Sequence, residues 1–330
     1  MRLSLVGFLA LPAALHAQAP VLDSVRALVR AGAGEQALAY ARAQAQAAPG
    51  DAWAHHALAR AALARNDLDA AVAAAERSVQ LAPWDSRHHL VLGESYLEKA
   101  DANGGLGALG TAKKGRTALE RAVELDPDNL DAREWLLSYH LEAPGIAGGD
   151  KAEAARQAAE MVRRNVVRGR AAEMRVALAS GDDYDVTYAF EQTLALLLAG
   201  KDSAGILRGS LFNAAQQAKK DAQKEKLTAR LYAAFPDDLF ARYARARLWV
   251  IQGKQLPDAA AVLQGYIALP QRPANGPSLG GAHWRLGQAY EKMRREPDAL
   301  AEYRRAVELM PQFEDARKDF DRLERKLANR

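Results

Sequence analysis

A glycine-rich segment of this sequence formally matches the G-x-G-x-x-G pattern by which many proteins bind a dinucleotide. The pattern is formed by Gly105, Gly107 and Gly110. In dinucleotide-binding proteins it follows a buried strand and opens a helix, with an acidic residue about 20 positions further on. Here it follows a helical pattern that ends near Lys99, and Thr111 stands where a phosphate-binding loop needs lysine. We therefore interpret the segment as a connector between two helices.

The same segment could still bind an anion through backbone amides. The second helix is expected to begin near Thr111, and Lys113, Lys114 and Arg116 follow closely. A helix N-terminus attracts anions because its first amides have no partner within the helix. An anion or an acidic segment of a partner is thus the alternative to a solvated connector.

Histidines recur at about one fixed distance, which raises the question of a metal site. The pairs His55-His56 and His88-His89 are about one period apart, and His283 falls in the same frame as His55 and His89. Zinc needs three or four converging ligands, and no carboxylate recurs in this frame. We therefore interpret the histidines as packing residues and predict neither a metal nor a cofactor.

Other common chemical sites find no support in the sequence. The absence of cysteine excludes disulfides, thiolate metal sites and a cysteine nucleophile. The acidic run at 182–185 lacks the glycine and terminal glutamate of a calcium-binding loop and is interpreted as a helix N-cap. Neither a G-x-S-x-G nor an H-E-x-x-H motif is present, so we predict that the protein is not an enzyme.

Charge gives little support for nucleic-acid binding. The formal net charge of +4 arises from 45 basic and 41 acidic residues. They interleave along the chain, whereas phosphate binding requires the basic residues to gather on one face. No nucleic-acid partner is predicted.

The elements that would position these residues repeat along the chain. One frame comprises Leu286, Gly287 and Tyr290 on a first helix, then Ala299, Tyr303 and Ala306 on a second helix, and finally Pro311. The same frame fits the residues from Leu58 to Pro83 and from Leu92 to Pro127. Small residues at fixed positions let paired helices approach closely, and proline ends the second helix.

This frame resembles that of the tetratricopeptide-repeat family over essentially the whole chain after residue 17. The resemblance implies an all-α solenoid of stacked helix pairs, which we predict to contain seven to eight units within 18–312. A helix over 313–330, apolar on one side and charged on the other, is expected to cap the stack.

The first 17 residues differ from the rest. Arg2 precedes an apolar stretch from Leu3 to Leu15, and small residues follow. This pattern is typical of a secretory signal peptide, and the stretch is too short to span a bilayer. We expect cleavage after Ala17, with Ala19 as the second choice because Pro20 would then stand at the new N-terminus. The expected protein is periplasmic or secreted, with no stable membrane span.

Two units carry glycine-rich insertions between their helices, at 100–110 and at 143–150. The second insertion contains Gly148 and Gly149. Turns of one kind lie along one edge of a solenoid, so we expect the two insertions to be neighbours. The candidate residues of this loop edge are Gly105, Gly107, Gly110, Lys113, Lys114, Gly148 and Gly149.

The resemblance also implies where a partner would bind. In this family, certain positions of each first helix line the inner groove that contacts partner peptides. Here those positions include Trp53, His56, Arg60, Arg87, Glu94, Glu134, Trp284 and Gln288. The interpretation is an adaptor of the cell envelope that binds a partner protein or peptide, without catalysis. The alternative is a small-ligand or anion-binding protein that uses residues 104–116.

Overall fold

The computed structural model describes residues 20–105, 107–202, 204–271 and 276–329, and all regular structure in these ranges is helical. The expected signal peptide lies outside them. The chain divides into two compact units, Met1–Ala158 and Ala159–Arg330, with the boundary inside one helix. The predicted all-α class of stacked helix pairs is confirmed.

Many helices begin at an aspartate or asparagine that accepts a hydrogen bond from a free backbone amide. Asp51 accepts from the amide of Trp53 at 2.9 Å, and Asp182 accepts from the amide of Tyr184 at 2.8 Å. Such caps stabilise the first turn. The acidic run at 182–185 is therefore the helix cap that the sequence predicts.

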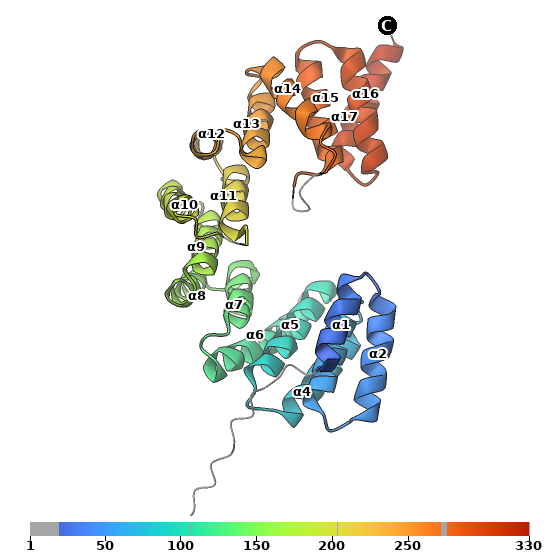
Figure 1. The fold of residues 1–330 in the computed structure, drawn as a ribbon, viewed down its shortest axis with the longest axis vertical. Helices are drawn as coiled ribbons and strands as arrows, with labels where there is room; N and C mark the ends of the chain where they lie inside the picture. Colours follow the sequence, from blue (N-terminus) through green and yellow to red (C-terminus); the bar gives the residue numbers. More distant parts are fainter. Residues whose placement is uncertain (1–19, 106, 203, 272–275, 330) are drawn as a thin grey trace, which may run out of the picture. The chain divides into compact units, whose positions relative to one another are not determined.

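Over its described residues, unit 1 contains seven helices, a short 3-10 turn and the beginning of an eighth helix (Figure 1). They are α1 (Pro20–Arg30), α2 (Gly34–Ala47), α3 (Ala52–Ala64), α4 (Leu68–Leu81), α5 (Ser86–Asn103), α6 (Ala108–Leu125), α7 (Leu130–Glu142), η1 (Gly145–Ala147) and α8 (Lys151–Arg164).

Unit 2 contains, in the part that the structure describes, the end of α8 and nine further helices. They are α9 (Val166–Ser180), α10 (Asp183–Leu198), α11 (Ile206–Gln217), α12 (Asp221–Ala234), α13 (Leu239–Gln252), α14 (Leu256–Ile267), α15 (Leu279–Lys292), α16 (Glu296–Leu309) and α17 (Glu314–Ala328).

Successive helices form pairs, and the first helices of neighbouring pairs also touch. In unit 1, α3 packs against α1 and α5, and α5 packs against α7; in unit 2, α11 packs against α9 and α13, and α13 against α15. We call the surface that these first helices share the A face of each unit. It is the surface where the predicted groove residues stand.

The paired helices meet at glycine and alanine. A Cβ atom on Gly93 of α5 would lie 2.5 Å from Leu119 Cγ of α6, and one on Gly115 would lie 2.8 Å from Leu97 Cδ2. Gly287 of α15 stands equally close to Tyr303 of α16. The small residues of the repeat frame thus permit the helix contact that buries the larger ones.

The turns between pairs share a bond that sequence reasoning missed. His55 Nε2 lies 3.1 Å from the carbonyl oxygen of Pro49, and His89 Nε2 lies 2.9 Å from that of Pro83. Arg133 Nε donates to Pro127 at 2.9 Å in the same way. In each case the proline stands six residues earlier, so this side chain satisfies a backbone carbonyl of the turn that follows the ended helix. This supports the packing role predicted for His55 and His89.

The glycine-rich insertion at 100–110 is mostly helical, which corrects the expected loop. Helix α5 continues to Asn103 and α6 begins at Ala108, so both helices have 18 residues. Gly104 and Gly105 have φ of +59° and +64°, which lets the chain turn directly after α5. Alanines at 100, 102 and 108 favour the added helical residues on either side.

The second insertion does form a turn, η1, which packs against α6. Tyr139 of α7 donates to the carbonyl of Ala147. A Cβ on Gly149 would lie 1.8 Å from the carbonyl oxygen of Ala143, so only glycine fits there. A Cβ on Gly148 would lie 2.6 Å from Arg116, which stands about two turns into α6. This insertion therefore contacts the side of α6.

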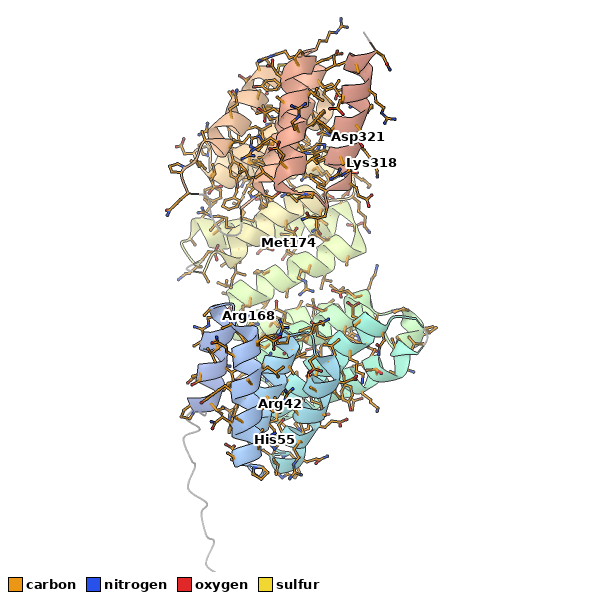
Figure 2. All side chains as sticks on the ribbon, turned by 90° about the vertical axis from the view of Figure 1, so that its right-hand side faces the viewer. Arg42, His55, Arg168, Met174, Lys318 and Asp321 are labelled. Carbon is orange, nitrogen blue, oxygen red and sulfur yellow. The ribbon has the colours of Figure 1, made fainter. Side chains whose placement is uncertain are left out.

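The C-terminal helix caps unit 2 as predicted. Ala316 and Leu323 of α17 are fully buried, and Phe320 packs against the same core as Tyr303. Charged residues such as Lys318 and Asp321 face solvent (Figure 2). A helix with one apolar side covers the last pair without needing a further partner.

The close approach at Gly93 can be tested by adding one methyl group. We expect Gly93→Ala to lower the free energy of unfolding by about 1–3 kcal/mol. The new Cβ overlaps the buried Leu119, and the cost of this overlap exceeds what alanine gains in helix propensity. Gly110→Ala in the paired helix is the control, since a Cβ atom added there would have nothing within 4 Å. Chemical denaturation of both variants measures the difference, and equal stabilities would contradict the packing argument.

Candidate functional site

A groove on the A face of unit 1 is the first candidate binding site. It is a hollow of about 430 Å³ between α1, α3 and α5. Val25, Val29 and Leu63 form its apolar floor, and charged side chains surround them. The surrounding charged residues are Arg26, Arg30, Arg60, Glu94 and Glu98. We call this hollow the unit 1 groove.

Two predicted groove residues, Arg60 and Glu94, bind each other across helices. Arg60 Nη1 donates to Glu94 Oε2 at 2.5 Å, and their side chains are 28% and 17% exposed. Burial raises the pKa of Glu94, although the neighbouring Arg60 opposes this effect. The pair ties α3 to α5 and presents one charge of each sign to the groove.

Trp53 lies beside two buried histidines rather than alone on the surface. Its ring centroid is 5.0 Å from that of His56 and 4.8 Å from that of His88, and the guanidinium of Arg87 lies 4.4 Å above the ring. Arg87 also binds Asp85 through two nitrogens. We call Trp53, His56, His88 and Arg87 the aromatic cluster. His56 is only 3% exposed, so it supports the groove rather than lining its surface.

The two histidines of the aromatic cluster are held neutral. His56 Nδ1 lies 3.2 Å from His88 Nδ1, so one imidazole donates to the other. Burial lowers the pKa of His88 to about 4, and burial followed by the nearby Arg60 lowers the pKa of His56. Two protonated imidazoles would face each other with two donors and no acceptor.

The remaining groove residues have different surroundings. Glu134 is partly buried on α7, in the A face of unit 1. Trp284 faces the capping helix: its Nε1 donates to Asp319 at 2.9 Å and its ring lies 4.9 Å from that of Phe313. Gln288 Nε2 lies 3.4 Å from the same Asp319 oxygen. These two residues thus join α15 to α17.

The predicted loop edge is only partly assembled. Gly105 and Gly107 lie in the short α5–α6 turn, whereas Gly110 lies within α6. Gly110, Lys113 and Lys114 line a hollow of about 580 Å³ beside α6. Gly148 and Gly149 belong to the turn that packs on the side of α6 near Arg116.

Sequence reasoning missed two arginines on the A face of unit 2. Arg247 of α13 and Arg285 of α15 are partly buried, and Arg285 lines a hollow of about 560 Å³ with residues of α13, α16 and α17. The available signal was their place in the repeat frame: Arg285 stands where α3 and α5 have Ala57 and Val91, and Arg247, counted from its capping Asp238, stands where they have Arg60 and Glu94.

Neither a metal site nor a membrane span is found in the part of the chain that the structure describes. Within these ranges, no group of three or more histidine, aspartate or glutamate side chains could hold a metal ion. None of the helices described combines the length and apolar character that crossing a membrane requires.

The buried histidine pair predicts a loss of stability in acid. In the unfolded chain histidine has a pKa of about 6.5, whereas burial in the folded chain lowers the pKa of His88 to about 4. The folded state therefore has its full stability above about pH 6.5 and loses stability as the pH falls towards 4, because only the unfolded chain takes up the proton. We expect His88 alone to lower the free energy of unfolding by about 2 kcal/mol between pH 7 and 5.

His88→Gln keeps a hydrogen-bonding side chain that does not titrate. Denaturant unfolding at pH 7 and pH 5 should therefore show a smaller pH dependence for this variant than for the native chain. Identical pH dependences would contradict the assigned neutrality of His88.

Comparison with known proteins identifies the repeat. The family model described as tetratricopeptide repeat matches residues 280–313. No curated protein matches the chain.

The solved structures that match this chain include a tetratricopeptide repeat protein from Parabacteroides merdae, with 12% identity, a TM-score of 0.47, and coverage of 92% of this chain and 97% of that chain. A thermophilic protein of the same kind from Thermus thermophilus has 19% identity, a TM-score of 0.31, and coverage of 70% and 98%.

The matched residues comprise α15, α16 and the turn into α17, and they include the close contact of Gly287 with Tyr303. The same small-residue frame recurs in α3 to α6 of unit 1. Residues 280–313 are therefore a tetratricopeptide repeat, and the frame in unit 1 resembles it.

Proposed function

We propose that the protein is an exported adaptor of the cell envelope that binds an extended segment of another protein in the unit 1 groove. The observation that carries this proposal is the apolar floor of Val25, Val29 and Leu63 between charged walls. A hollow of about 430 Å³ accommodates a few side chains of a partner segment. Tetratricopeptide-repeat folds suggest protein–protein interaction scaffolds, which are generally not catalytic.

The groove is suited to recognition by shape and charge together. Burying partner side chains on the floor contributes about 25 cal/mol per Å² of apolar surface. The walls present both signs of charge, since α1 contributes Arg26 and Arg30 while α5 contributes Glu94 and Glu98. A segment with its own charges in the complementary order would bind in one direction.

The Arg60–Glu94 pair keeps this surface in place without a bound partner. Because the pair links α3 to α5 and the aromatic cluster links the same two helices, the groove walls are held before binding. A preformed site avoids part of the entropy cost of ordering side chains on association.

The alternative, an anion-binding site at residues 104–116, has one supporting observation. The hollow beside α6 brings together Gly110, Lys113 and Lys114. Arg121 also lines the hollow but is paired with Glu124 at 3.0 Å, and Glu120 is a further carboxylate there that opposes an anion. The unit 1 groove is therefore the better-supported site.

Site-specific photocrosslinking in the native host tests the groove. A photoreactive residue at Glu98, which lines the groove, should capture a defined partner protein. The same residue at Arg77 of α4, which lies outside the groove lining, is the control. We expect Val29→Glu to lower the Glu98 yield about tenfold, because it places a charge on the apolar floor.

Two results would contradict a partner in the groove: equal capture from Glu98 and Arg77, or a yield that Val29→Glu leaves unchanged. The melting temperature of Val29→Glu is measured in parallel, so that unfolding is not mistaken for loss of binding.

Export is a separate part of the proposal, and it is supported by the pattern of the first 17 residues. We expect mass spectrometry of the protein purified from the envelope fraction of its native host to find an N-terminus at Gln18. Replacing Leu5 and Val6 by Asp should leave the full chain inside the cell, because an apolar segment is required for export. An N-terminus at Met1 or Arg2 in the exported protein would contradict cleavage.

A further inference from the structure

Two arginines on the A face of unit 2, Arg247 and Arg285, are partly buried. Arg285 stands two residues before Gly287; at the corresponding places, α3 has Ala57 and α5 has Val91, which are both fully buried. Arg247 stands nine residues after the capping Asp238, where α3 has Arg60 and α5 has Glu94, the pair that lines the unit 1 groove. A partly buried guanidinium loses hydration, so it costs stability unless a partner compensates.

Only neutral groups of this chain hydrogen-bond to the two guanidinium groups within the described residues. Arg285 Nη1 donates to Gln288 Oε1 at 2.7 Å, and its guanidinium lies 4.1 Å above the Trp284 ring. Arg247 Nη1 donates to the amide oxygen of Gln216. Neither bond brings a negative charge to the arginines.

The two charges also disfavour each other. Burial, followed by repulsion from Arg247, lowers the pKa of Arg285 to about 10, and burial lowers the pKa of Arg247. Both remain protonated at neutral pH. The adjacent Tyr243 supplies no charge, because burial raises the pKa of its hydroxyl to about 12.

Two of the carboxylates near Arg285 already have other partners. Asp315 and Asp319 attract Arg285 over a longer range, without a hydrogen bond to it, and the oxygens of Asp319 accept hydrogen bonds from Trp284 and Arg322. Glu291 accepts two bonds from Arg322, at 2.6 and 2.8 Å. Both carboxylates are thus committed within the stack.

An open surface adjoins the arginines. Arg285 lines the hollow of about 560 Å³, to which Lys292 and Arg322 contribute two further cations, against the two carboxylates Glu291 and Asp319. The lining therefore carries one net positive charge, with Arg322 paired to both carboxylates, and Arg247 adds to the positive field at Arg285. A ligand of opposite charge has access to it.

We propose that Arg247 and Arg285 bind the carboxylate side chains of an acidic segment of a partner protein on the A face of unit 2. The inference rests on the proposed adaptor function and adds the chemical class of the bound segment. Charge-assisted bonds between guanidinium and carboxylate are shorter and stronger than neutral ones. Because these arginines are already partly dehydrated by the fold, they lose less hydration when the carboxylates arrive.

Selection from a library of random 12-residue peptides displayed on phage tests the proposal directly. The full chain is immobilised and the retained peptides are sequenced. We expect aspartate and glutamate to be enriched at least twofold over the unselected library. The double variant Arg247→Met, Arg285→Met should lose this enrichment. Arg305→Met, an exposed arginine on α16, should keep it.

Thermal unfolding of the same variants separates binding from folding. The double variant should melt at or above the temperature of the native chain, because methionine fills a similar volume without a buried charge. A lower melting temperature would indicate that the arginines stabilise the fold, and would overturn the proposal. Arg285→Lys is a further variant, which keeps the charge but loses the two-pronged geometry, and it should show a weaker acidic preference.

The outcomes distinguish this inference from the proposed function. Retained peptides without acidic enrichment, or with equal enrichment for the double variant, would overturn the role of the arginines while leaving peptide binding intact. Retention of no peptide by the native chain would count against the adaptor function, and the inference would fail with it.

Discussion

The structure depends on how closely the two helices of a pair can approach. At Gly93 and Gly115 the backbones of α5 and α6 come near enough that a Cβ on either glycine would overlap a leucine of the other helix. Gly287 permits the same contact with Tyr303 in the last pair. The contact within a pair buries only the apolar surface between its two helices. The apolar surface on the outside of the pair must be covered by the next pair or by a capping helix such as α17.

This constraint explains why much of the fold could be predicted from the sequence. A small residue that recurs in a fixed frame has one structural cause, the helix contact, and proline at the end of a unit has another. The lengths of α5 and α6 were not predictable in the same way. Glycine suggested a loop over 100–110, but at Gly110 the alanines and lysines nearby favour helix and nothing crowds the site.

The candidate site was less predictable, because its character depends on contacts between repeats. Counting positions along each helix predicts Arg60 and Glu94 on one face, but it could not show that they bind each other. His56 occupies a groove position in the frame, yet the facing His88 and Trp53 bury it. Whether a side chain at such a position is exposed is decided by the neighbouring repeat, which the frame of one repeat does not contain.

The two A faces differ in how their charges are balanced, and this difference bears on recognition. In unit 1 the arginine at the groove has an internal partner, Glu94, so the fold itself satisfies the charge. In unit 2, over the residues that the structure describes, Arg247 and Arg285 lack an equivalent carboxylate, and their hydrogen bonds go to amides. A repeat stack tolerates such a cost because stability is spread over many pair contacts. Specificity can therefore reside in a few polar residues while the small residues that build the stack stay the same.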